Sequence, residues 1–171
     1  MRARNDRRSG VAKIEYTETD RQGLDLVGPL WQKLNEHHKL CSRYFSEHYP
    51  RMTFDQRKKE LLDKSREGAI RIDLARDADT GELVGYCIST VTAKRQGEID
   101  SIYVEDGYRH SGVGDNLVKR TLDWMKGFPV TRKKVEVIVG NEEAFAFYER
   151  YNFRPRSTVL EQVEVKEVDK S

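Results

Sequence analysis

The hexapeptide Arg-His-Ser-Gly-Val-Gly at residues 109–114 has the composition of a backbone site for an anion. A strand-forming segment ends at Val104, and the helical spacing of apolar residues begins with Val113. The first N–H groups of a helix lack partners within the helix, and with the helix dipole they bind phosphate groups. Gly112 and Gly114 would let a ligand approach the backbone without an intervening Cβ. The stretch predicts a phosphate site at a strand-to-helix connection.

Two common nucleotide-binding motifs do not fit this stretch. No Gly-Lys-Ser or Gly-Lys-Thr follows, so it is not a P-loop. The strands expected before it form a meander rather than a βαβ unit, so it is not the dinucleotide fingerprint. Glycines at a helix start also serve ordinary turns, and the phosphate prediction therefore depends on the rest of the chain.

Hydrophobic periodicity and turn residues predict the elements that must position this stretch. Strands are expected at 12–17, 69–77, 82–93, 97–106 and 133–139, with one or two closing strands in 153–165; helices are expected at 24–41, 53–68, 113–125 and 141–152. Gly28 and Pro29 should kink the first helix or mark its true start. This order predicts an α/β (α+β) fold with a mixed, mostly antiparallel sheet of about six to seven strands and four helices.

Composition predicts one domain in a reducing compartment. The chain has 171 residues, 37% of them hydrophobic, which suits a single core at 11–171 after a flexible basic tail at 1–10. Its 31 basic and 29 acidic residues nearly cancel, so we expect neither nucleic acid nor a membrane as the main partner. Only residues 2–8 would favour a nucleic-acid arm. Two cysteines and no leader or long apolar run predict a cytoplasmic location.

A cluster of histidines invites comparison with a metal site. His37, His38, Cys41 and His48 lie close together in the sequence. Helical spacing brings His37 and Cys41 to one face, but His38 points elsewhere and no second ligand pair follows at a metal-site interval. We therefore expect no metal.

The wider segment IYVEDGYRHSGVGDNLVKRTLDWM resembles the acetyl-coenzyme A motif of the GNAT superfamily of N-acetyltransferases. In that motif Arg or Gln is followed by two residues, Gly, one residue, and Gly or Ala. Arg109, Gly112 and Gly114 fill these places.

A second segment, VEVIVGNEEAFAFYERYNFRPR, resembles the family's other motif, in which an asparagine after a strand opens a helix that ends in a tyrosine. The matching residues are Asn141, Ala144, Phe147, Tyr148 and Phe153. Asn152 replaces the usual glycine at the helix end, where asparagine is the next-best residue for a left-handed cap.

The resemblance covers roughly residues 12–163 and implies a sheet splayed between its fourth and fifth strands, with the pantetheine arm of acetyl-CoA in the splay. It implies that backbone groups of Ile102, Tyr103 and Val104 hold this arm and that Asn141 contacts it, a role compatible with an N-cap. The pyrophosphate is assigned to Arg109, His110, Ser111, Gly112, Val113 and Gly114.

The resemblance also implies transfer of the acetyl group to a primary amine by direct attack in a ternary complex. Tyr148 is then the expected general acid and a cofactor contact, because a phenol with a pKa near 10 can protonate the leaving thiolate. Packing on the apolar helix face is its alternative. Glu98, Asp100 and Glu136 are candidate bases, with a salt bridge or a water-mediated proton transfer as alternatives. By strand period, Glu98 and Asp100 share a face.

The expected partners are acetyl-CoA and an amine acceptor, either a small molecule or a protein amine. A non-catalytic acyl-CoA-binding module of the same fold is the alternative. The resemblance implies that the first two helices and their connection form one wall of the acceptor pocket. His37, His38, Tyr44 and Phe45 would then lie on the substrate side or merely on the surface. Three converging carboxylates would make a mildly acidic pocket suited to a cationic amine. The closing strands could pair two copies into a homodimer.

Overall fold

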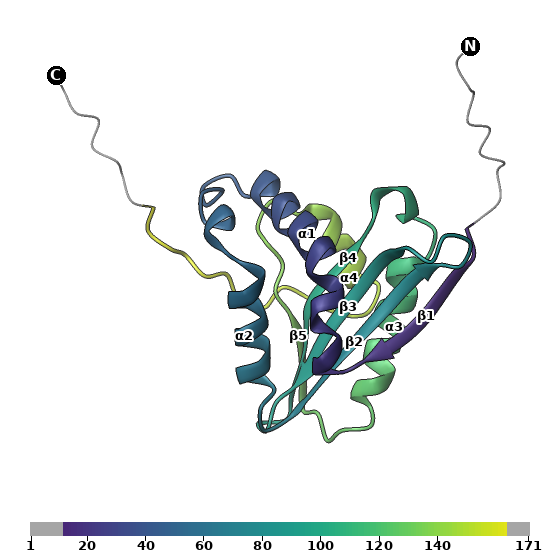
Figure 1. Ribbon diagram of the computed structural model, residues 1–171. Coiled ribbons are helices and arrows are strands. Elements are labelled where there is room, and N and C mark those ends of the chain that lie inside the picture. Colours follow the sequence, from purple (N-terminus) through teal and green to yellow (C-terminus); the bar gives the residue numbers. More distant parts are fainter. Residues whose placement is uncertain (1–11, 164–171) are drawn as a thin grey trace, which may run out of the picture.

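The computed structural model describes residues 12–163, and the expected basic tail lies outside them. A five-stranded sheet with the order β1-β2-β3-β4-β5 forms its centre (Figure 1). The strands are β1 (Ile14–Thr19), β2 (Ala69–Asp77), β3 (Leu83–Val91), β4 (Gln96–Val104) and β5 (Arg132–Val135). Neighbours are antiparallel except β4 and β5, which are parallel. The mixed, mostly antiparallel sheet is confirmed.

The expected strand count of six to seven is too high. Residues 136–139 do not continue β5, and residues 154–163 form no strand. Pro155 lacks a backbone donor, and Val159 and Leu160 are almost fully exposed, so this segment gains no buried partner for its apolar side chains. Alternation of apolar residues therefore overestimated the sheet at its C-terminal edge.

The described residues also contain four α-helices and three 3-10 helices. They are η1 (Arg21–Val27), α1 (Gly28–Cys41), η2 (Tyr49–Arg51), α2 (Phe54–Lys64), η3 (Asp106–Tyr108), α3 (Val113–Met125) and α4 (Glu142–Glu149). Gly28 marks the true start of α1, with Pro29 in its first turn, where proline is favoured. Thr53 caps α2 in a capping box with Gln56.

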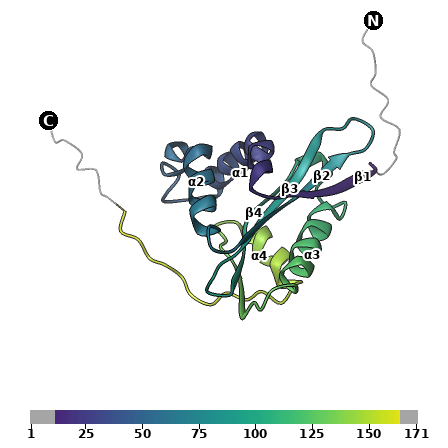
Figure 2. The ribbon, with the colours of Figure 1, turned by 60° about the horizontal axis from the view of Figure 1, so that its bottom comes forward.

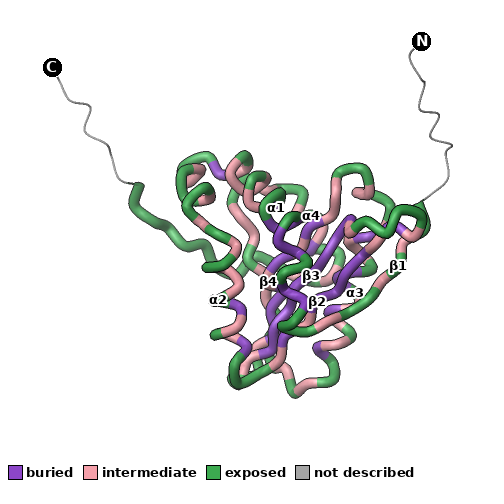
Figure 3. The backbone as a smooth tube through the Cα atoms, in the orientation of Figure 1, coloured by how far each residue is buried: buried purple, intermediate pink, exposed green. Residues whose placement is uncertain are grey.

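The helices cover the two faces of the sheet in pairs (Figure 2). Helices α1 and α2 lie on one face, and α3 and α4 lie on the other. Each pair buries its own apolar cluster against the central strands, which are the most buried part of the chain (Figure 3). The α1/α2 cluster includes Trp31, Ile72 and Tyr86, and the α3/α4 cluster includes Cys87 and Leu117. No helix among residues 12–163 is long and apolar enough to cross a membrane.

A β-bulge interrupts β4 at Asp100. Ile99 pairs with Ser89 and Ser101 pairs with Ile88, so Asp100 has no partner of its own in β3. Bulges change the direction of side chains, and here the successive residues Asp100 and Ser101 both face the α1/α2 side of the sheet. Thr90 Oγ1 donates to Asp100 Oδ2 at 2.7 Å, and the hydroxyls of Ser101 and Tyr86 are 2.8 Å apart.

Pairing between β4 and β5 ends at this bulge. The last paired residues are Ile99 and Val135, and β4 continues to Val104 without β5 beside it. The fourth and fifth strands therefore part, as the family resemblance implied.

Gly68 fixes how α2 joins the sheet. A Cβ at this position would lie 2.0 Å from the carbonyl oxygen of Val91. We expect Gly68→Ala to lower the free energy of unfolding by roughly 2 kcal/mol or more, because backbone atoms must shift to admit the methyl group. Urea unfolding measures the change.

Gly107→Ala is the matched control, since a Cβ there meets nothing within 4 Å. Equal stability of the two variants would show that the approach between Gly68 and β3 is not rigid.

Candidate active site

The N-terminus of α3 has no side-chain cap. Gly112 occupies the N-cap position with a φ of +87°, in the left-handed region that favours glycine. Helices α2 and α4 are instead capped by Thr53 and Asn141. A Cβ at Gly112 would meet nothing within 4 Å. The first N–H groups of α3 thus remain free of a capping side chain at an open position, as an anion site requires.

The loop that leads into α3 is tied to the sheet by side chains. Arg109 Nε donates to the carbonyl of Val104 at 3.0 Å, and its guanidinium lies over the ring of Tyr103. Ser111 Oγ donates to the carbonyl of Tyr108 at 2.6 Å. The Arg109 side chain therefore holds the loop to the end of β4. His110, also left-handed with a φ of +59°, is exposed.

Tyr108 anchors the same loop to the β2–β3 hairpin. Its hydroxyl donates to Asp77 Oδ2 at 2.6 Å. This hydrogen bond, together with the backbone N–H of Asp79, holds the pKa of Asp77 below its ordinary value. Tyr108 and Asp77 are 31 residues apart, so no local spacing in the sequence indicates this pair.

Gly114 and Val113 have packing roles. A Cβ on Gly114 would lie 3.4 Å from the ring of Phe147, so glycine here lets α3 approach α4. Val113 is buried in the α3/α4 cluster. Of the two glycines in the hexapeptide, Gly112 is therefore the one whose conformation shapes the helix entrance.

The three predicted β4 residues lie on both faces of the sheet beyond the last β4–β5 pair. Tyr103 is buried against the α1/α2 cluster, whereas Ile102 and Val104 pack against the α3/α4 cluster. Arginine side chains contact β4 carbonyls in this region: Arg57 donates to Asp100 O at 2.9 Å, as Arg109 does to Val104 O.

Tyr148 lies on α4, on the face of the sheet opposite to Asp100. It is 5% exposed and packs against the rings of Phe147 and Phe153. Burial raises its pKa well above the ordinary value, so the phenol stays protonated at neutral pH. The structure therefore shows Tyr148 as a buried packing residue whose hydroxyl keeps its proton.

Asn141 caps α4, as expected. Its side-chain oxygen accepts from the N–H of Ala144 at 3.3 Å. The preceding residue, Gly140, has a φ of +100°, and a Cβ there would lie 2.3 Å from the carbonyl oxygen of Cys41. The end of α1 thus packs closely against the turn before α4, and this close approach requires a glycine at position 140.

Two of the candidate bases converge on the α1/α2 face, and each has a cation beside it. Lys64 Nζ contacts both Glu98 Oε2, at 2.5 Å, and Asp100 Oδ1. Lys134 Nζ lies 2.9 Å from Glu98 Oε2 and 3.0 Å from Glu136 Oε1. The Asp100 carboxylate has no exposed surface, whereas that of Glu136 is 82% exposed. We call Arg57, Lys64, Glu98, Asp100, Lys134 and Glu136 the charged cluster.

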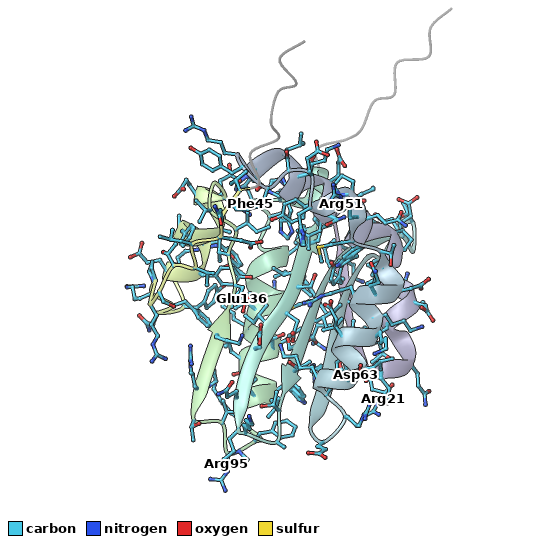
Figure 4. All side chains as sticks on the ribbon, turned by 90° about the vertical axis from the view of Figure 1, so that its left-hand side faces the viewer. Arg21, Phe45, Arg51, Asp63, Arg95 and Glu136 are labelled. Atoms are coloured by element: carbon cyan, nitrogen blue, oxygen red, sulfur yellow. The ribbon has the colours of Figure 1, made fainter. Side chains whose placement is uncertain are left out.

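The electrostatics of the charged cluster are balanced rather than acidic. Burial raises the pKa of Asp100, and Lys64 and Thr90 oppose this effect. Lys134 lowers the pKa of Glu136. Three carboxylates face three cations, so their convergence does not produce the acidic pocket expected from carboxylates alone. In Figure 4 Glu136 lies near the middle of this side, with Phe45 and Arg51 above it.

Sequence reasoning missed the cations of this cluster. Arg57 and Lys64 lie four residues before and three residues after the buried Leu61, so helical spacing places all three on one face of α2. Positive residues on the inward face of an amphipathic helix were the available signal.

The histidine cluster forms ring contacts. His37 Nε2 lies 3.5 Å from Cys41 Sγ, and His38 packs against the ring of Tyr49. Residues 12–163 contain no group of three His, Cys, Asp or Glu side chains that could hold a metal. Burial, and then the neighbouring His37, lowers the pKa of His38 to about 4.

Two cavities lie away from these residues. One of about 480 Å³ is lined mainly by α1, η2 and the start of α2, including Trp31 and Phe54. Another of about 310 Å³ is lined by Leu122, Tyr151 and Phe153, among others. Neither borders Gly112, Tyr148 or the charged cluster.

A sequence model of the acetyltransferase (GNAT) family matches residues 31–153, and the chain belongs to this family. An N-alpha-acetyltransferase of Sulfolobus acidocaldarius is 33% identical over 86 residues, covering 43% of this chain and 51% of that protein. The chain thus matches about half the length of this curated relative.

Solved structures share the fold at low identity. The PaiA N-acetyltransferase of Thermoplasma acidophilum, in complex with coenzyme A, has a TM-score of 0.66 at 20% identity, covering 86% of this chain and 93% of that one. A ribosomal-protein-alanine N-acetyltransferase of Brucella melitensis has a TM-score of 0.62 at 19% identity, covering 88% and 99%. These similarities confirm the GNAT fold.

His38 should make stability fall in mild acid. Its folded pKa of about 4 lies below its ordinary 6.5, so between these values the unfolded chain binds a proton that the folded chain does not. The free energy of unfolding should decrease as the pH falls through this window. We expect His38→Gln to remove on the order of 2 kcal/mol of that decrease.

Urea unfolding at pH 7 and pH 4.5 would measure this effect, with His48→Gln as control because the His48 side chain is exposed. If His38→Gln and the unmodified chain lose equal stability on acidification, His38 is protonated in the folded state.

Proposed function

We propose that this chain transfers the acetyl group of acetyl-CoA to a primary amine. Membership of the GNAT family supports acyl transfer. The observation that carries the proposal is the entrance to α3, where the left-handed Gly112 leaves the first helical N–H groups uncapped just after the end of β4. The relative solved in complex with coenzyme A adds support for this cosubstrate.

In this proposal the N–H groups of residues 111–114 bind the pyrophosphate and the β4 backbone from Ile102 to Val104 holds the pantetheine arm. Ile102 and Val104 lie in the part of β4 that has no β5 partner. Asn141 positions the start of α4 next to the arm. Acetyl-CoA supplies an activated acyl group, and the chain supplies its orientation.

Proton transfers then divide between the two faces of the sheet. Tyr148, on the α3/α4 side, protonates the leaving thiolate. Its raised pKa keeps the phenol protonated until then. On the α1/α2 side, Glu98 and Asp100 are positioned to take the proton of the incoming ammonium, either directly or through water. The amine attacks the thioester carbonyl in a ternary complex, with no acyl-enzyme.

The curated relative and the two structural relatives are all named as N-acetyltransferases, and their names do not give one common acceptor. We further propose a cytoplasmic location, a single domain over residues 11–171 and pairing of two copies through the closing segment. The two unpaired cysteines support the first of these.

Gly112→Val tests the cofactor site. A branched side chain at the helix entrance would stand against the phosphates, so we expect the affinity for acetyl-CoA to fall about tenfold or more. Isothermal titration calorimetry gives the dissociation constant. Gly81→Val is the control, because Gly81 also has a positive φ, of +73°, and open space around it, but lies in the β2–β3 turn. Similar affinity in both variants would remove the phosphate site from the proposal.

Tyr148→Phe tests the acid. The variant keeps the ring and its packing, so we expect acetyl-CoA affinity to be nearly unchanged while kcat falls about a hundredfold. The assay is release of free coenzyme A with a panel of primary amines that includes spermidine, a lysine-containing peptide and a peptide with an N-terminal alanine. Tyr151→Phe is the control, since its hydroxyl is engaged by Asp115.

Undiminished turnover of Tyr148→Phe would exclude Tyr148 as the acid. If acetyl-CoA raises the melting temperature but no amine releases coenzyme A above background hydrolysis, the chain is a non-catalytic acyl-CoA-binding module.

A further inference from the structure

Lys64 places a primary amine at the point where β4 and β5 part. It is the last residue of α2, and its Nζ contacts Glu98, which lies in the paired part of β4, and Asp100, which lies in the bulge just beyond it. The side chain is 28% exposed. An amine held by two carboxylates beside the splay is chemically the acceptor that the proposed function requires.

Glu98 and Asp100 each keep another partner when Lys64 is modified. Glu98 keeps Lys134 at 2.9 Å, and the Asp100 carboxylate keeps the hydroxyl of Thr90 at 2.7 Å and Arg57 NH2 at 3.9 Å. A buried carboxylate is costly when it loses every partner. Loss of the positive charge on Lys64 leaves neither carboxylate without a partner. The fold can therefore accommodate a modified Lys64.

A proton acceptor is already in contact with the ammonium group. Glu98 Oε2 lies 2.5 Å from Lys64 Nζ. The raised pKa of Asp100, caused by burial, makes that carboxylate a stronger base than an exposed aspartate. The amine and its base therefore need no rearrangement of the backbone to exchange a proton.

Two surface lysines lack this arrangement. Lys59 and Lys126 are 80% and 74% exposed and pair with Asp63 and Asp123, which are close to them in the sequence. They are open to slow chemical acetylation from solution, and neither is paired with Glu98 or Asp100. They provide an internal measure of background reactivity.

We propose that Lys64 is an acetylation site of the chain itself, modified by the acetyl-CoA that the same chain binds. The inference rests on the proposed function. Glu98 takes one proton from the Lys64 ammonium, and the Nζ lone pair forms a bond to the thioester carbonyl carbon. The C–S bond then breaks, and a second proton lost from the nitrogen balances the proton taken up by the leaving thiolate. The products are acetyl-lysine, coenzyme A and the proton that Glu98 releases.

The experiment incubates the full chain with acetyl-CoA and no added amine, and follows each lysine by peptide mass spectrometry. We expect one acetyl group on Lys64, formed about tenfold or more faster than on Lys59 or Lys126, because the bound thioester is at high effective concentration. The rate constant should be independent of protein concentration. Modification no faster than at the two surface lysines, or a rate constant that rises with protein concentration, would overturn the proposal.

Variants distinguish acetylation by bound acetyl-CoA from acetylation by acetyl-CoA free in solution. Gly112→Val should lose the rapid modification of Lys64 and keep the background on Lys59, whereas Gly81→Val should keep both. Persistence of rapid Lys64 acetylation in Gly112→Val, at unchanged acetyl-CoA concentration, would contradict a site fed by bound cosubstrate. Lys64→Arg should lose the tryptic acetyl-peptide of residue 64 alone.

The outcome is distinguishable from failure of the proposed function. If the chain acetylates an amine of the panel but Lys64 reacts no faster than Lys59, the self-acetylation is wrong and the acetyltransferase proposal stands. If acetyl-CoA neither raises the melting temperature nor modifies Lys64, both fail.

Discussion

The buried carboxylate of Asp100 determines how the two sides of the candidate active site are arranged. A charge with no exposed surface must be paired or hydrogen-bonded, because its desolvation is otherwise not compensated. Lys64 and Arg57 from α2 and Thr90 from β3 meet this requirement. The helix is therefore held over β4 by the same residue whose bulge coincides with the end of β4–β5 pairing. The position of α2 and the end of β4–β5 pairing thus both involve Asp100.

The parting of the strands connects two faces that the sheet otherwise separates. Tyr148 belongs to the cluster under α3 and α4, whereas Glu98 and Asp100 face α1 and α2. A thioester could be reached by an acid from one face and a base from the other only where β4 lacks a neighbour. The uncapped start of α3 lies at the end of the same strand. In the proposed function, anion binding and both proton transfers thus depend on β4.

Local sequence signals predicted the parts of this arrangement that are themselves local. The helix cap at Asn141, the strand-to-helix connection before α3 and the shared face of Glu98 and Asp100 follow from spacing and backbone preference, and the structure has them. The closing strands were wrong because alternation indicates only that a segment could pair; whether a sheet edge receives it is decided by tertiary contacts. The cations beside Glu98 and Asp100 were missed for a related reason. Lys64 and Lys134 are brought together by the fold, across a large sequence separation.

The balance of the charged cluster bears directly on acceptor recognition. Carboxylates counted from the sequence suggested attraction of a cationic amine, but Lys64, Lys134 and Arg57 cancel that field at short range. An entering ammonium must exchange with a resident lysine, because Glu98 and Asp100 are already in contact with Lys64. Such an exchange conserves charge, so the net affinity comes from shape and from the remaining hydrogen bonds rather than from net charge. In the proposed function, specificity for the amine then comes from groups other than the carboxylates that would prepare the amine for attack.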